Sequence, residues 1–164
     1  MLLSSKANAV LASTAIVCIS TSGCKSPSTV GEVAFADPLF RECVTTVYST
    51  DTPVSEVVEL NCQATPISSL IGAQWLSGLK ILRLEGPNTI TDLKPISKLT
   101  EFSILSLYGL SQELVDVKPL LDAPAFAELY IENAPNLDCT DVYFLRAMLG
   151  ANYILTSNGV CQGE

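Results

Sequence analysis

The side chains that could do chemistry in this chain are carboxylates and cysteines, because the sequence contains no histidine. Hydrolytic catalysis usually needs a general base beside a nucleophile, and without histidine the choice narrows to carboxylates, lysines or a serine–lysine pair. Two acidic pairs are candidates, Asp138 with Asp141 and Asp92 with Asp116. The first pair falls at a predicted helix start, where negative charge is favourable without any catalytic role. The second pair recurs beside lysines, as on a charged surface.

Other motifs of catalysis and cofactor binding are missing from the sequence. It contains neither a glycine-rich phosphate loop nor a nucleophile elbow. Metal binding is disfavoured because Cys-x-x-Cys and histidine are both lacking. The net charge of −8, without a cluster of lysine or arginine, argues against nucleic acid as a partner. We therefore expect a protein that is not an enzyme, with no catalytic residue, no cofactor, no metal site and no small-molecule substrate.

The six cysteines favour disulfide bonds in an exported protein. Two of them fall in or directly after an apolar leader, and the other four allow three pairings. We favour Cys43 with Cys62 and Cys139 with Cys161, because each pair would tie a terminal segment to its nearest repeat. Closing loops of about 20 residues would stabilise each end by about 3 kcal/mol in the chain-entropy model. The alternative is four buried, reduced thiols.

Residues 1–23 have the pattern of a signal peptide. Lys6 precedes an apolar stretch from Ala7 to Ile19, which is too short to span a bilayer comfortably. The segment Thr21-Ser22-Gly23-Cys24 resembles a bacterial lipobox, in which the leader is cut before the cysteine and Cys24 is lipidated. Two or more acyl chains anchor a protein stably. The alternative is ordinary cleavage after Ala36.

The lipobox resemblance also implies a location. Because no aspartate follows Cys24, the lipoprotein sorting pattern implies the bacterial outer membrane, with the protein facing either the periplasm or the cell surface. Residues 24–34 then form a lipidated tether, whose first part is polar and aperiodic.

The part of the chain that follows the leader and tether contains short repeats. An apolar triplet at relative positions one, four and six recurs four times, at steps of 22, 23 and 24 residues. The triplets are Val57/Leu60/Cys62, Leu79/Leu82/Leu84, Phe102/Leu105/Leu107 and Phe126/Leu129/Ile131. Between triplets, every third residue is apolar: Ile67, Leu70, Ala73, Leu76; Ile90, Leu93, Ile96, Leu99; and Leu114, Val117, Leu120, Ala123. A period of three, with Pro95 and Pro119 at equivalent places, predicts 3₁₀ or irregular return segments between strands.

These repeats resemble a known family. Leu79-Lys80-Ile81-Leu82-Arg83-Leu84 with Ile90-Thr91-Asp92-Leu93-Lys94-Pro95-Ile96 is similar to the short leucine-rich repeat of bacterial internalin-like proteins, a strand Leu-x-x-Leu-x-Leu followed by Ile-x-Asp-Leu-x-Pro-Leu. The resemblance covers roughly Val57 to Leu137. It implies an α/β fold, a short right-handed leucine-rich repeat solenoid with a parallel concave sheet and a 3₁₀ or irregular convex side. The asparagine that usually follows the strand in that family has counterparts near its position in Asn88 of the second unit and in Asn133 or Asn136 of the fourth, whereas Leu110 lies near it in the third.

We expect helical caps on both ends of the solenoid, so that the domains are a signal peptide (1–23), a tether (24–34), an N-terminal cap (35–56), repeats (57–137) and a C-terminal cap (138–164). Asp37-Pro38 predicts a helix start, with one face formed by Leu39, Phe40, Cys43, Val44, Val47 and Tyr48. Thr140 or Asp141 predicts a second start, with Val142, Leu145, Met148 and Leu149 on one face and Gly150 after the helix. Residues 153–155 could add a last strand.

Residues that flank the inward triplets should point out of the sheet, because side chains alternate along a strand. We assign them to three rows: Val58, Ile81, Ile104, Glu128; Asn61, Arg83, Ser106, Tyr130; and Gln63, Glu85, Tyr108, Glu132. The predicted partner-binding residues are Val58, Ile81, Arg83, Ile104, Tyr108, Glu128 and Tyr130. Aliphatic, tyrosine and arginine side chains commonly anchor protein interfaces. The alternative is that β-branched residues and tyrosines simply suit strands.

The sequence therefore predicts a non-catalytic, lipid-anchored protein of the cell envelope that binds a protein partner through its concave sheet. Two alternatives stay open. One is a structural or assembly lipoprotein of the outer membrane, in which the coils only space a larger complex. The other is a host-contact or inhibitor protein displayed on the surface.

Overall fold

The structure is a computed structural model that describes residues 25–63, 66–109, 113–123, 127–132, 134–149 and 153–156. The predicted signal peptide and Cys24 lie outside the described residues. Five strands alternate with short helices in the order η1 (Val30–Glu32), α1 (Pro38–Val47), η2 (Val54–Glu56), β1 (Glu59–Gln63), η3 (Ala73–Trp75), β2 (Ile81–Glu85), α2 (Lys94–Ser97), β3 (Ile104–Tyr108), η4 (Lys118–Asp122), β4 (Glu128–Glu132), α3 (Cys139–Leu149) and β5 (Tyr153–Thr156), where η denotes a 3₁₀ helix.

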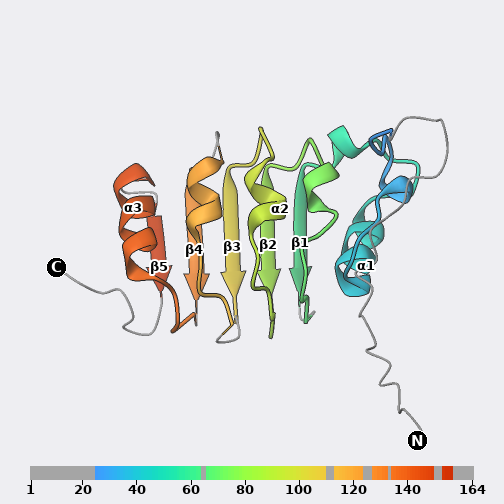
Figure 1. The fold of residues 1–164 in the computed structure, drawn as a ribbon. Coiled ribbons are helices and arrows are strands. Elements are labelled where there is room, and N and C mark those ends of the chain that lie inside the picture. The colour runs from blue at the N-terminus through green and yellow to red at the C-terminus, as the bar shows by residue number, and fades with distance from the viewer. Residues whose placement is uncertain are drawn as a thin grey trace, which may run out of the picture.

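The strands form one parallel sheet in sequence order, from β1 at one edge to β5 at the other (Figure 1). The register places the inward leucines Leu60, Leu82, Leu105 and Leu129 side by side on neighbouring strands. All four are fully buried. The prediction that these leucines lie next to one another on parallel strands is therefore confirmed.

A repeated backbone contact fixes this register just before each strand. One carbonyl oxygen of each coil accepts hydrogen bonds from two successive N–H groups of the next coil. The three sets are Val58 O with Lys80 N and Ile81 N (2.9 and 3.1 Å), Lys80 O with Ser103 N and Ile104 N (2.9 and 3.0 Å), and Ser103 O with Ala127 N and Glu128 N (both 2.9 Å). Because the same bond recurs at the same position, each coil is aligned on the one before it.

The return segments η3, α2 and η4 lie on one face of the sheet, toward the viewer in Figure 1. Two are 3₁₀ helices and α2 is a four-residue α-helical turn. A 3₁₀ helix has three residues per turn, so every third side chain points the same way. All twelve apolar residues of the period-three pattern are buried, and eleven of them, all but Ala123, belong to one core cluster with the inward leucines.

At the amino-terminal end, α1 lies alongside the outer edge of β1 (Figure 1). The helix begins where the sequence predicts, because Asp37 Oδ1 accepts hydrogen bonds from the backbone N–H groups of Leu39 (2.8 Å) and Phe40 (3.0 Å). Phe40 and Val44 are fully buried. Val47 was expected on the same face but is 57% exposed. It is the last helical residue, and it follows the two buried turns.

The predicted tether is shorter than residues 24–34. Val30, the first residue of η1, and Val33, directly after η1, are buried. The backbone N–H groups of Val30 and Gly31 donate to the carbonyl oxygens of Thr52 (2.9 Å) and Thr50 (2.8 Å). The second half of residues 24–34 therefore belongs to the folded unit, because the side chains of Val30 and Val33 are buried in it.

At the other end, α3 begins one residue before the predicted start, with Asp138 Oδ1 accepting from Thr140 N at 2.8 Å. Val142 and Leu145 are buried as expected, but Met148 is 57% exposed. The helix contacts η4 and leads into β5, which pairs in parallel with β4. It thus takes the place of a fourth return segment, and only its Val142–Leu145 side meets the core. The predicted inward position of Leu149 and the role of Gly150 lie outside what the structure describes.

Candidate interaction surface

The outward positions of β1 to β4 form three rows that follow the strand register. The first row consists of Glu59, Ile81, Ile104 and Glu128. Val58 was expected in this row, and the structure corrects that assignment to Glu59. Val58 lies one residue before β1, at the position whose carbonyl oxygen holds the next coil. Because side chains alternate, a shift of one residue moves a side chain to the other face or off the strand.

An apolar and aromatic strip crosses the centre of this outward face. Ile81 and Ile104 are paired across β2 and β3, and Tyr108 and Tyr130 lie on β3 and β4. All four side chains are partly exposed to solvent. The structure brings these four predicted partner-binding residues together, with Arg83 and Glu128 beside them. Val58 is the one predicted member outside the rows.

Arg83 forms an ion pair within the sheet. Its guanidinium donates a hydrogen bond to the Glu59 carboxylate on the neighbouring strand. On its other side the register pairs Arg83 with Ser106 and Ser106 with Tyr130. Ser106 is only 3% exposed, because a short side chain between two long ones is covered. Glu59 therefore partly neutralises the positive charge of Arg83 in the unbound protein.

Solved structures similar to this chain include bacterial internalins. An internalin (InlF) from Listeria monocytogenes superposes with a TM-score of 0.59 and 26% identity, over 79% of this chain and 40% of that one. Internalin C2 from the same species gives a TM-score of 0.59 and 23% identity, over 79% of this chain and 57% of that one. The fold is the internalin-like leucine-rich repeat. No protein-family model and no curated protein sequence matches the chain, and it spans about half the length of these structures.

Asn88 connects two coils of the leucine-rich repeat. It is fully buried, its Oδ1 accepts from the backbone N–H of Ile67 (3.1 Å), and its Nδ2 donates to the carbonyl oxygen of Gly86 (3.2 Å). The backbone N–H of Thr89 donates to the carbonyl oxygen of Ile67 at 3.0 Å. Asn88 thus satisfies polar backbone groups of both coils at a turn that water does not reach.

Three of the four carboxylates that the sequence offered as catalytic candidates, Asp92, Asp116 and Asp138, accept hydrogen bonds from nearby backbone N–H groups. Asp92 and Asp116 each accept a hydrogen bond from the N–H of the lysine two residues later, at 2.8 Å in both coils. Asp138 does the same at the start of α3. Asp141 is mostly buried and lies 3.7 Å from Lys118 Nζ. Within the described residues, no group of acidic or cysteine side chains is arranged to hold a metal ion.

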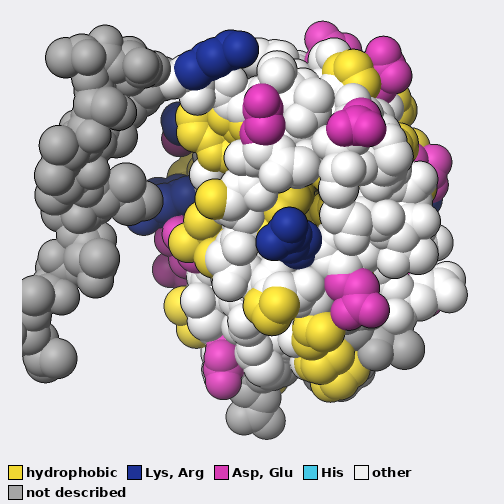
Figure 2. Space-filling view, turned by 90° about the vertical axis from the view of Figure 1, so that its right-hand side faces the viewer, with side chains coloured by type: hydrophobic (Ala, Val, Ile, Leu, Met, Phe, Trp, Pro, Cys, Tyr) yellow, Lys and Arg dark blue, Asp and Glu magenta, His cyan; other side chains and the backbone are white. Residues whose placement is uncertain are grey.

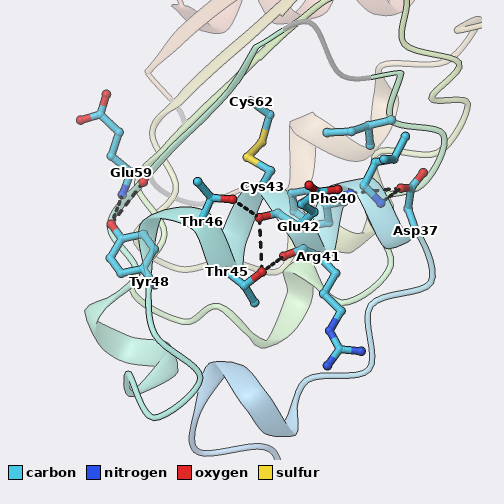
Figure 3. Close-up of a disulfide and its surroundings, with 12 residues drawn as sticks. Asp37, Phe40, Arg41, Glu42, Cys43, Thr45, Thr46, Tyr48, Glu59 and Cys62 are labelled. Carbon is cyan, nitrogen blue, oxygen red and sulfur yellow. Dashed lines mark hydrogen bonds between the residues drawn. A yellow bond between two sulfur atoms is a disulfide. The ribbon is translucent and has the colours of Figure 1, made fainter.

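A disulfide fastens α1 to the first strand. Cys43 and Cys62 are bonded, as predicted, with a Cα–Cα distance of 5.6 Å. At the other end of β1, Tyr48 Oη donates to the carbonyl oxygen of Glu59 (3.2 Å) and accepts from Val58 N (3.2 Å). Figure 3 shows the disulfide at the middle of the helix and the contact of Tyr48 with Glu59 beyond its carboxyl-terminal end. Cys139 is also in disulfide form, but Cys161 and Cys24 lie outside the described residues, so the predicted Cys139–Cys161 pair stays a prediction.

Two hollows lie beside the sheet, and the first of them includes the outward residues Asn61 and Gln63 of β1. One, of about 380 Å³, lies beside the disulfide between α1 and β1 and is lined by residues such as Leu39 and Thr46. The other, of about 560 Å³, lies between α2 and η4 and is lined by Lys94, Lys98 and Lys118 among others. Figure 2 looks onto the α1 end, where hydrophobic side chains form small separate patches among acidic and uncharged ones. The face shown there lacks a continuous apolar surface.

Glu59 is the surface residue that the sequence analysis missed. Counted from Val57 as position one, Glu59 occupies position three, and the same count gives Ile81 and Ile104 in the next coils. The signal was therefore present in the spacing. The spacing does not predict the ion pair between Glu59 and Arg83, because these two residues are 24 positions apart in the sequence.

Proposed function

We propose that this chain is a non-catalytic, lipid-anchored leucine-rich repeat protein of the bacterial cell envelope, which binds a protein partner through the outward face of β1 to β4. The observation that supports this proposal is the partly exposed strip of Ile81, Ile104, Tyr108 and Tyr130 on a rigid parallel sheet. Aliphatic and tyrosine side chains held on a fixed backbone lose little conformational freedom when they bind.

We also propose that the coils wind to the right and that α1 and α3 act as caps. Parallel strands joined by crossovers in one sheet are right-handed in nearly all proteins. A repeat stack needs its terminal apolar faces covered. The Cys43–Cys62 bond and the Tyr48 hydrogen bonds, which hold α1 against the edge of β1, support the amino-terminal cap.

The anchoring part of the proposal rests on the sequence around Cys24. An apolar leader followed by Thr-Ser-Gly-Cys supports lipidation and placement in the outer membrane. Among the described residues no helix is both long and apolar enough to cross a bilayer. The Cys24→Ala variant should lose incorporation of labelled palmitate and leave the membrane fraction, whereas Cys24 in the natural chain should carry the label.

The binding part is tested by site-specific photo-crosslinking in intact cells. A photoreactive amino acid replaces Tyr108 or Tyr130, and the matched control replaces Val115, which is 50% exposed on the return side of the third coil. We expect one discrete adduct from each tyrosine position and none from Val115. Equal adducts from all three positions, or adducts from Val115 alone, would assign the contact to another surface.

A further inference from the structure

The outward face carries its charge unevenly. On the β1–β2 side, Glu59 is paired with Arg83, and the remaining outward positions of β1 are the uncharged Asn61 and Gln63. Three further outward carboxylates are Glu85, at the end of β2 next to β3, and Glu128 and Glu132 on β4. Within the described part of the chain, none of these three forms an ion pair.

The three carboxylates flank the two tyrosines. Tyr108 is paired with Glu85 on β2, and the register that joins Leu107 to Ile131 brings Glu132 to its other side on β4. Tyr130 lies between Glu128 and Glu132 along β4. Neighbouring strands are about 4.8 Å apart and alternate residues about 6.8 Å apart. Each ring therefore has a carboxylate on two sides, within the reach of one incoming cation.

We propose that this acidic half of the face, formed by Glu85, Tyr108, Glu128, Tyr130 and Glu132, binds a basic segment of the partner protein. Lysine or arginine side chains of that segment lie over the tyrosine rings and pair with the flanking carboxylates, and an adjacent aliphatic side chain packs on Ile104. The inference rests on the proposed function, because it specifies the chemistry of the partner at the same sheet.

Charge complementarity decides between partner classes. A cation over a tyrosine face is attracted by the ring, and nearby carboxylates add to that attraction. An acidic partner would meet three like charges. An uncharged partner would take water from three carboxylates without replacing the lost hydrogen bonds, which is unfavourable. The one arginine of this face is already paired with Glu59, so the compensating cations must come from the partner.

The test selects ligands from a random linear peptide library displayed on phage, with the full chain immobilised as bait. Enriched peptides are synthesised, and their affinities are measured by fluorescence anisotropy. The test variant is Glu85→Gln/Glu132→Gln, and the matched control is Glu42→Gln/Glu56→Gln, which removes the same charge at two exposed positions on α1 and η2. A third variant, Ile104→Asn, reports whether a peptide binds the sheet at all.

We expect enriched peptides to carry lysine or arginine next to an aliphatic residue. The Glu85→Gln/Glu132→Gln variant should bind them about tenfold more weakly, with no change for the control pair and with weaker binding at high salt. One result would overturn this inference alone: enriched peptides that carry no positive charge, that bind the Ile104→Asn variant more weakly, and that bind Glu85→Gln/Glu132→Gln as well as the natural chain. Peptides that tolerate Ile104→Asn, or a selection that enriches none, would count against the proposed function as well.

Discussion

The carboxylate of Asp37 joins the start of α1 to the segment around Ser68. Oδ1 caps α1, and Oδ2 accepts from both the backbone N–H and the hydroxyl of Ser68, each at 2.7 Å. Burial alone would raise the pKa of Asp37, but the hydrogen bonds from Ser68, Phe40 and Leu39 outweigh it and lower the pKa below the ordinary value of 3.8. The ionised form is therefore the one that the fold stabilises.

This balance predicts a pH-dependent effect of Asp37→Asn. The variant should lower the free energy of unfolding by about 1–2 kcal/mol at neutral pH, because a cap and a charge-assisted bond weaken. With a lowered folded-state pKa, the contribution of Asp37 is complete above 3.8 and is lost as the pH falls through the folded-state value. Urea unfolding at pH 7 and pH 3 should show the difference between the two proteins shrinking. Asp51→Asn, at an exposed position, is the control, and a constant difference would contradict the assignment.

Asn88 gives a second prediction at the scale of one residue. Asn88→Ala should cost about 1–3 kcal/mol of unfolding free energy, because the buried N–H of Ile67 loses its acceptor. Hydrogen exchange should accelerate at Ile67 in particular. Thr91→Ala, at an exposed position in the same turn, should change neither quantity. Unaltered protection of Ile67 in Asn88→Ala would show that another group holds this turn.

At the scale of elements, the attachment of α1 to β1 depends on the disulfide. The bond closes a loop between residues 19 positions apart, which contributes about 3 kcal/mol in the chain-entropy model. The variant Cys43→Ala/Cys62→Val keeps an apolar residue at the inward position, where the other coils have Leu84, Leu107 and Ile131. We expect it to unfold at lower urea by a corresponding amount. An unchanged midpoint would mean that Tyr48 and the buried face of α1 suffice.

Reduction of the natural protein is the control for this variant. It should destabilise the natural chain by at least as much as the double substitution does. In Cys43→Ala/Cys62→Val, the disulfide that remains among the described residues is that of Cys139. A variant that responds to reduction as strongly as the natural chain would assign the stabilisation to the carboxyl-terminal end instead.

Across the whole molecule, the parts that the sequence predicted are those with a repeated local cause. Leu82 and Leu105 were placed because every coil must bury the same positions, and Asp37-Pro38 marked a helix start by local rules. The contacts that the sequence did not predict join distant residues, such as Asp37 with Ser68 and Glu59 with Arg83. Met148 was misplaced because helical spacing shows which residues share a face, but not how far the neighbouring coil extends along α3.

The same repetition predicts how the molecule unfolds. Among the described residues the main contacts of each coil are with the neighbouring coils, so stability is shared along the stack through interfaces between coils. Leu105→Ala in the third coil should cost about 2–5 kcal/mol. In a cooperative stack, the loss of unfolding free energy extends to the first coil. Trp75, the one tryptophan of the chain, lies in η3 of that coil and reports on its unfolding. Fluorescence of Trp75 and far-ultraviolet circular dichroism should then shift together in urea. Val115→Ala, at an exposed site, should shift neither. A circular dichroism midpoint that moves while the Trp75 transition stays would show coils that unfold separately, and the outward face would then not act as one rigid surface.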